Sequence, residues 1–173
     1  NTKTQHHSFT FPTKLQLVSK LNKSFPLLSS KMSKMVKAIV TSPKIYKPVG
    51  PYSQAVVANN TLYVSGVLGC DADTKLVAGG TGAQARKALE NLRHVLEAGG
   101  SKMEAVVKTT ILMANMEDFQ EFNKVYAEFF PKNCPARAAY QVAKLPMNAA
   151  IEIEAIALVG DVVVEEFNAS SHI

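Results

Sequence analysis

The chain has 173 residues, 47% of them hydrophobic, so it is long enough to bury a core and too short for two full domains. No stretch reaches the about 18 consecutive apolar residues that cross a bilayer, which argues against a membrane protein. The net charge of +5 comes mainly from one end: residues 1–47 hold nine of the 19 basic side chains and no acid, which leaves ten against 14 acids, about −4, in the remainder.

Residues 1–34 are rich in Lys, Ser, Thr and His and show no sustained periodicity, so we expect a flexible basic tail ahead of a domain over residues 35–173. Met32 and Met35 are each a candidate start, in which case the residues before them are leader or added sequence. Alternatively the acid-free, Ser-rich tail is a mitochondrial transit peptide, although it contains no arginine. The expected location is therefore cytoplasmic, or mitochondrial if the tail is a transit peptide.

The first part of the domain is predicted to be β-structure. Val36–Thr41 is rich in β-forming residues and precedes a loop punctuated by prolines over residues 43–51. Ala55–Ala58 and Leu62–Ser65 then predict two strands, and Asn59-Asn60 between them suits a tight turn because Asn tolerates positive φ. These two strands are expected to form a hairpin.

Two amphipathic helices follow, separated by a strand. Thr81-x-x-Gln84 matches a capping box, and apolar residues then recur every three or four positions up to Gly99. Ala105–Met113 is rich in threonine and valine, as strands are, and the second helix begins near Met116 and ends before Pro131 and Pro135.

The last strands are predicted at Ala138–Ala143 and Ala149–Val159, with a loop around Pro146. The order is β, β, β, α, β, α, β, β, which predicts an α+β domain with one mixed sheet covered by two helices. Two helices cover only one face of such a sheet, so we expect the chain to associate through the other face.

Two carboxylates on the last strand are the most unusual feature of the domain. Glu152 and Glu154 alternate with apolar residues, so both point to one face, about 6.5 Å apart. A glycosidase pair is disfavoured, because such carboxylates stand on separate elements around a cleft with tryptophan platforms, and this chain has no Trp. The alternative is structural: both glutamates are half-exposed at a sheet end or pair with a lysine.

Arg137 is the one arginine of the three that lies between a loop and a strand, since Arg86 and Arg93 fall on the polar face of the first helix. A guanidinium fixed there offers a planar fork that matches a carboxylate, which makes a bound acid a reasonable ligand. The alternative is a salt bridge to Glu152 or Glu154.

Other candidate residues carry weaker signals. Tyr52 and Ser53 follow Gly50-Pro51 at the entry to a strand, and Asn123 lies beside the aromatic face of the second helix. Gly79-Gly80-Thr81-Gly82 is interpreted as a turn, because neither a P-loop nor a dinucleotide signature follows. The histidines are scattered, which disfavours a metal site, and we expect Cys70 and Cys134 to be reduced thiols.

Four segments, in this order and spacing, resemble the reactive intermediate deaminase (RidA) family over about residues 36–160. They are Gly50-Pro51-Tyr52-Ser53-Gln54-Ala55, Ser65-Gly66, Pro135-Ala136-Arg137-Ala138-Ala139-Tyr140 and Ile151-Glu152-Ile153-Glu154-Ala155. The resemblance implies a chorismate-mutase-like α+β fold, a homotrimer with clefts between subunits, and no cofactor or metal. It also implies hydrolytic deamination of 2-iminobutanoate and 2-iminopropanoate to 2-oxo acids and ammonia.

The same resemblance implies roles for individual residues. Arg137 would bind the substrate carboxylate, Glu152 would position or activate water, and Glu154 would be structural. The cleft would be lined by Tyr52, Ser65, Gly66, Asn123 and Ala139. Val67, and Met147-Asn148 after Leu-Pro, depart from the usual family residues and bear on substrate preference rather than activity.

Two other functions compete with deamination. Some family members are described as single-strand endoribonucleases or translation inhibitors, and the lysine-rich tail would help contact RNA phosphates. RNA is the less favoured partner, because the domain is net acidic and offers no histidine pair for phosphodiester cleavage. A non-catalytic, ligand-binding or chaperone-like trimer would use the same clefts without needing Glu152.

Overall fold

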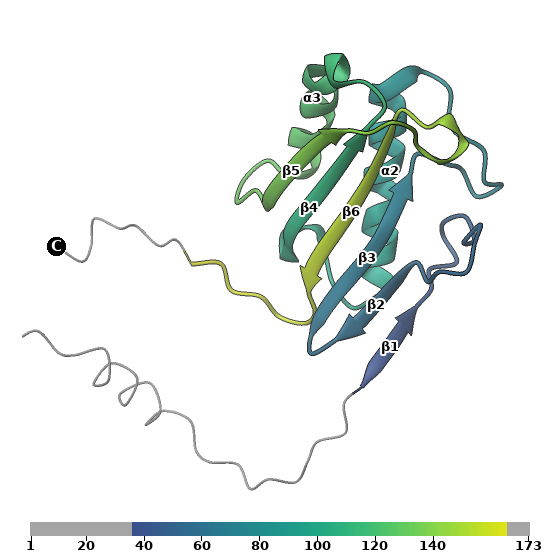
Figure 1. Ribbon diagram of the computed structural model, residues 1–173. Coiled ribbons are helices and arrows are strands. Elements are labelled where there is room, and N and C mark those ends of the chain that lie inside the picture. Colours follow the sequence, from purple (N-terminus) through teal and green to yellow (C-terminus); the bar gives the residue numbers. More distant parts are fainter. Residues whose placement is uncertain (1–35, 166–173) are drawn as a thin grey trace, which may run out of the picture. The chain divides into compact units, whose positions relative to one another are not determined.

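The computed structural model describes residues 36–165 (Figure 1). The strands are β1 (Lys37–Val40), β2 (Ala55–Ala58), β3 (Thr61–Leu68), β4 (Val106–Met113), β5 (Ala136–Gln141) and β6 (Ile151–Leu158). The helices are α2 (Gly80–Ala98) and α3 (Phe119–Phe129), with single 3-10 turns at Met103–Ala105, Met116–Asp118 and Pro146–Asn148. The expectations for residues 1–34 fall outside the described residues.

All six strands form one sheet in the order β1-β2-β3-β6-β4-β5. Its strand pairs are antiparallel except β4 and β5, which run parallel. A parallel pair needs a crossover connection, and α3 supplies it between β4 and β5. The predicted α+β architecture with one mixed sheet and two covering helices is therefore confirmed.

Both helices pack on the same face of the sheet, as the ribbon shows (Figure 1). On β6 the residues that point to the helices are fully or almost fully buried: Ile151, Ile153, Ala155 and Ala157. The other face keeps large apolar side chains in solvent, including Ile39, Tyr63 and Tyr140, which are 58%, 50% and 56% exposed. The helices thus complete the core on one side only.

The predicted strands and helices are all present, and two strands differ most in their bounds. The strand predicted over Ala138–Ala143 is β5, Ala136–Gln141, so Arg137 lies within the strand rather than before it. The strand expected over Leu62–Ser65 continues as β3 to Leu68, and its register with β6 shifts between Val64 and Val67. This bulge lies at Ser65-Gly66, where a glycine disfavours a regular ladder. The predicted hairpin is confirmed, and Asn59 and Asn60 have φ values of 50° and 59°.

The predicted capping box at the start of α2 is wrong. The N-cap is Gly79, in the left-handed region with φ 108°, and it makes no side-chain cap hydrogen bond. Thr81 instead pairs through Oγ1 with Oδ2 of Asp118 at 2.6 Å, and Gln84 accepts from the Ala150 amide through Oε1 at 2.8 Å. Both polar side chains therefore connect α2 to distant segments rather than capping their own helix.

The glycine-rich segment at the start of α2 makes its hydrogen bond to a side chain of the same chain. The helix begins at Gly80, so three of the four residues predicted as a turn, Gly80 to Gly82, are helical, and only Gly79 lies outside the helix. The Gly82 amide donates to Oε1 of Glu121 at 3.0 Å, so a carboxylate from α3 interacts favourably with the helix N-terminus.

No helix in the described part of the chain is long and apolar enough to cross a membrane.

Candidate functional site

A cavity of about 270 Å³ lies where the loop of residues 41–54 meets the ends of β3 and β6. Four of the expected site residues line it together: Tyr52, Ser65, Gly66 and Glu152. The rest of its lining comes from Tyr46, Val49, Leu68, Pro146 and Glu154. Three of the four segments that carry the resemblance thus converge on one hollow, although they are up to 100 residues apart.

Glu152 is the ionisable group best placed for chemistry in this cavity. It is half-buried on β6, next to Gly66 on β3, and Gly66 has no side chain that would occupy the position of the carboxylate. Burial raises the pKa of Glu152, and the negative charge of Glu154 raises it further. A carboxylate that holds its proton more tightly than usual is suited to exchange protons with a reacting group.

The loop that contributes Tyr46 and Tyr52 to the cavity is held by hydrogen bonds from a buried glutamine. Gln54 accepts from the Ser42 amide through Oε1 at 2.6 Å and donates through Nε2 to the Tyr46 carbonyl at 3.0 Å. The Ser65 hydroxyl donates to the Ser53 carbonyl at 2.7 Å. Because Ser65 commits its proton to the backbone, its oxygen faces a ligand as an acceptor.

Tyr52 is the most accessible of the expected site residues in the cavity, with 40% of its surface exposed. Its hydroxyl accepts a long hydrogen bond of 3.4 Å from the Val49 amide, which leaves the O–H free to donate to a ligand. Tyr52 therefore offers an exposed donor to a cavity that two carboxylates, Glu152 and Glu154, also line.

Arg137 lies elsewhere, on the edge strand β5 and against the aromatic face of α3. Its guanidinium carbon is 5.4, 5.7 and 4.7 Å from the ring centroids of Phe119, Phe122 and Tyr126. The Tyr126 hydroxyl in turn bonds the buried Thr109 hydroxyl at 2.8 Å. Stacking on rings holds the guanidinium plane while leaving its N–H groups for an anion.

Asn123 and Ala139 belong to the surroundings of Arg137 rather than to the cavity. Ala139 is two residues along β5, on the same face as Arg137, and is half-buried. Asn123 is half-buried on α3, between two of the aromatic residues that contact Arg137. The seven expected site residues therefore form two groups, four at the cavity and three at the edge of the sheet.

The two groups lie on opposite faces of the sheet within one chain. Arg137 points to the helices, as does its partner in register, Thr109. Glu152 alternates with the buried Ile151 and Ile153 and so points away from the helices. A single chain consequently does not bring Arg137 and Glu152 to a common cavity, and neither glutamate forms the salt bridge to Arg137 that was considered as an alternative among the described residues.

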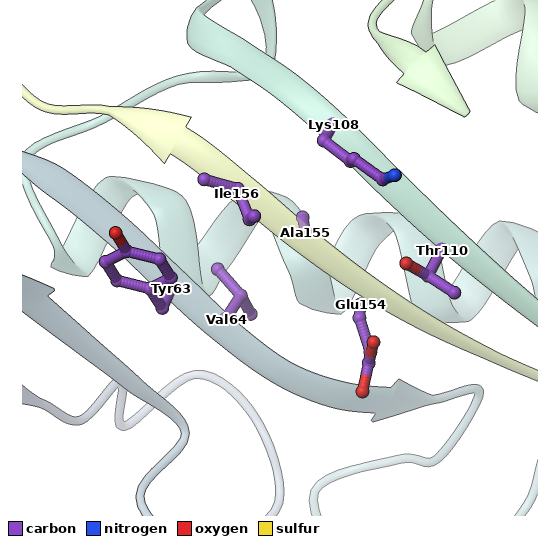
Figure 2. A pocket seen from close by; sticks show the side chains of 7 residues that line it. All are labelled: Tyr63, Val64, Lys108, Thr110, Glu154, Ala155 and Ile156. Carbon is purple, nitrogen blue, oxygen red and sulfur yellow. The ribbon is translucent and has the colours of Figure 1, made fainter. Parts of the chain in front are cut away.

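Glu154 borders a second hollow as well, of about 230 Å³, in the middle of the uncovered face (Figure 2). Figure 2 shows that its lining comes from three adjacent strands, with Tyr63 on β3, Glu154 and Ile156 on β6, and Lys108 and Thr110 on β4. Glu154 lines both this hollow and the cavity at Glu152, so the two are neighbours on the uncovered face. Residues 36–165 hold no group of three or more His, Cys, Asp or Glu side chains that could bind a metal.

The matches to known proteins cover the same segments. Residues 42–159 match the family model described as endoribonuclease L-PSP. The chain is 52% identical over 132 residues to the RutC family protein UK114 of Drosophila melanogaster, which covers 76% of this chain and 96% of that protein. It is 45% identical over 130 residues to the human 2-iminobutanoate/2-iminopropanoate deaminase, covering 75% and 95%. The crystal structure of RidA from the Antarctic bacterium Psychrobacter superposes with a TM-score of 0.68 at 38% identity, covering 70% of this chain and 99% of that one.

The chain belongs to the RidA (endoribonuclease L-PSP) family. The positions that depart from the RidA pattern do not alter the cavity at Glu152 directly. Val67 is buried, and Met147 and Asn148 follow Pro146 at the cavity rim with φ values of 59° and 57°. The family resemblance read from the sequence is thus confirmed, together with its fold.

The RidA motifs did not indicate four residues that line the cavity. The residues outside the four segments that carry the resemblance are Tyr46, Val49, Leu68 and Pro146. Tyr46 and Val49 belong to the proline-punctuated loop, whose path the sequence left open. Tyr46 is an aromatic residue in the loop just before Gly50-Pro51-Tyr52, and that position is the signal that could have suggested that it lines the site.

Proposed function

We propose that this chain hydrolyses 2-imino acids, with 2-iminobutanoate and 2-iminopropanoate as substrates, to 2-oxo acids and ammonia. The observation that carries the proposal is Glu152, a half-buried carboxylate with a raised pKa that lines a cavity of about 270 Å³. The close similarity to a human protein named for this reaction supports it.

Glu152 is assigned the proton transfers. The reaction adds water to the carbon of a protonated imine, C=NH2⁺, and then breaks the C–N bond. Glu152 accepts a proton from water as its oxygen bonds to carbon and returns that proton to nitrogen. The C–N bond then breaks as the C=O bond forms, and the hydroxyl proton passes through Glu152 to the departing ammonia, which leaves as ammonium. No electron acceptor is required, because the carbon keeps its oxidation state.

Arg137 is assigned the substrate carboxylate, and it would act from a neighbouring chain. The proposed assembly is a homotrimer in which the uncovered faces pack together and each edge strand β5 lies near the next chain's cavity. Large apolar residues left in solvent on that face, such as Tyr63 and Tyr140, support an association that buries them. The cation of one chain and the carboxylate of another then share one ligand.

RNA cleavage, the activity in the name of the family model, suits the cavity less well. Glu152 and Glu154 both line it, and two carboxylates repel a phosphodiester. The one histidine of residues 36–165, His94, lies on α2 beside Glu97 rather than at the cavity.

We also propose a reducing compartment, the cytoplasm or mitochondrial matrix, because Cys70 and Cys134 form no disulfide.

The test is an imine assay on the full chain. Imine is generated in the cuvette from threonine by a pyridoxal-phosphate-dependent dehydratase, and formation of 2-oxobutanoate is followed with and without the chain. Wild type should accelerate the step, and Glu152→Gln should remove about 10² to 10⁴-fold of the catalysis. If the wild-type chain does not accelerate 2-oxobutanoate formation, the chain is a binding module rather than a deaminase. Cleavage of single-stranded RNA that depends on Glu152 would favour the nuclease.

A further inference from the structure

Tyr46 is a buried tyrosine at the cavity to which the family motifs assign no role. Only 5% of its surface is exposed, and its hydroxyl accepts a hydrogen bond from the Leu68 amide at 2.8 Å. Burial raises the pKa of Tyr46 to about 12, so the phenol stays neutral at any physiological pH. A neutral phenol buried beside a carboxylate is a fixed structural element rather than a titrating one.

The hydrogen bond to Leu68 compensates for a gap in the sheet. β2 pairs with β3 only as far as Val64, and beyond it the outer edge of β3 has no strand beside it. The Ser65 amide is satisfied by the Gln54 carbonyl at 3.1 Å, and the Leu68 amide by the Tyr46 hydroxyl. A buried amide without a partner would cost stability, so this phenol takes the place of a missing strand.

Leu68 is also the residue directly opposite Glu152. The two are Cα partners in the β3 and β6 ladder, immediately after the bulge at Ser65-Gly66. A bulge frees the strand from regular pairing, so a bond on its far side is needed to hold the backbone in one position. The Tyr46 ring meanwhile lines the same cavity as the carboxylate of Glu152.

We propose that Tyr46 is a positioning residue for Glu152: its hydroxyl fixes β3 at Leu68, opposite the carboxylate, and its ring keeps water from the floor of the cavity. This inference rests on the proposed imine hydrolysis and adds a residue outside the family motifs to it. Gln54 supports the arrangement, because its side chain holds the Tyr46 carbonyl and the Ser42 amide.

The two functions of Tyr46 can be separated by substitution. Tyr46→Phe keeps the ring and removes the acceptor for the Leu68 amide. Tyr46→Leu removes both the hydroxyl and most of the flat ring, which admits water next to Glu152. Water stabilises the charged form of a carboxylate, so the second change lowers the pKa of Glu152 toward its ordinary value and the first leaves it nearly unchanged.

The experiment measures kcat and KM for imine hydrolysis across pH, together with the titration of Glu152 by NMR of ¹³C-labelled glutamate carboxyl groups. Tyr46→Phe should lower kcat about two- to tenfold, the equivalent of one hydrogen bond, with KM unchanged. Tyr46→Leu should lower kcat further and move the Glu152 midpoint to lower pH. Phe129→Leu is the control for losing an aromatic ring away from the site, since Phe129 is half-buried at the end of α3 and lines a different hollow, and both readouts should equal wild type.

The outcomes separate this inference from the proposed function. An active wild type whose kcat and Glu152 midpoint survive both Tyr46 substitutions overturns the positioning role and leaves imine hydrolysis standing. An inactive wild type overturns the proposed function. The NMR titration still decides, in that case, whether Tyr46 controls the environment of Glu152, and circular dichroism identifies any variant that has lost its fold.

Discussion

The Glu152 carboxylate occupies the space in which a side chain at residue 66 would begin. A Cβ built on Gly66 would overlap Oε1 of Glu152 and lie 2.6 Å from its Cδ. The glycine at the bulge of β3 is thus the neighbour that allows the glutamate of β6 to lie flat across the strand. The carboxylate of Glu152 fits beside residue 66 only because that residue is glycine. This explains why Ser65-Gly66 and Ile151-Glu152 contribute to the same site.

Gly66→Ala should therefore impair catalysis by displacing the carboxylate. A shift of about 1 Å in a catalytic group costs on the order of 100-fold, and we expect a loss of that size in kcat/KM for imine hydrolysis. Gly50→Ala is the control, because a Cβ there meets only ring atoms of Tyr52 at 3.6 and 3.7 Å, which is ordinary contact. Equal activity in the two variants would contradict the proposed geometry.

Glu152→Gln should be more stable than wild type at neutral pH, although less active. Burial and the charge of Glu154 raise the pKa of Glu152, so the folded chain binds this proton up to a higher pH than the unfolded chain does. Ionised Glu152 therefore destabilises the fold above that folded pKa, and the effect is absent below about pH 4.5, the ordinary value. The difference in Tm should grow as pH rises through this window and then level off.

Thermal unfolding from pH 4 to 8 measures this difference. Glu154→Gln is the comparison, because its side chain is exposed and its removal relieves only the repulsion. It should give a smaller rise in Tm. A Tm for Glu152→Gln that stays below wild type at every pH would show that the carboxylate is stabilised in the fold.

Arg137→Ala should raise KM for the imino acid by about 10- to 100-fold, the range for a hydrogen bond to a charged group. Arg137→Lys should recover part of the affinity, since an ammonium supplies charge without the planar fork. Arg93→Ala, an exposed arginine on α2, is the control for the loss of one positive charge. A KM unchanged by Arg137→Ala, measured by initial rates, would remove Arg137 from the site.

Mixing two inactive variants should restore activity if each site takes Arg137 and Glu152 from different chains. Random reassembly of Arg137→Ala with Glu152→Gln chains should reach about a quarter of wild-type activity, because roughly three-quarters of trimers are mixed and each holds one intact site. The subunits are mixed in mild denaturant, returned to buffer and assayed. Absence of any recovery, with trimers confirmed by light scattering, would place both groups in one chain.

The sequence predicted the strands and the helices because their signals are local. Alternation and three- to four-residue spacing report which face of an element is buried. The residue pattern marked Glu152 and Glu154 equally, because a carboxylate in an apolar strand is costly unless it has a purpose, and the resemblance to the RidA family singled out Glu152 and added Ser65 and Gly66. The position of Glu152 at the cavity agrees with that reasoning.

Other features depend on partners far away in the chain, which local patterns do not report. Thr81 and Gln84 had the spacing of a capping box, yet Asp118 and the Ala150 amide compete successfully for their side chains. The role of Tyr46 depends on where β2 stops, which sets the unpaired edge of β3. The separation of Arg137 from Glu152 depends on strand order, and a sequence does not show on which side of a sheet two strands present their residues.

In the proposed trimer, the placement of Arg137 and Glu152 on opposite sides of one sheet makes turnover depend on protein concentration. An isolated chain carries Arg137 for one site and Glu152 for another, so it forms no complete site by itself. The number of complete sites therefore depends on the concentration of assembled chains. Dilution below the dissociation constant of the assembly would then abolish catalytic activity while the chains stay folded. Cellular abundance, and not only substrate supply, would set the rate at which imines are removed.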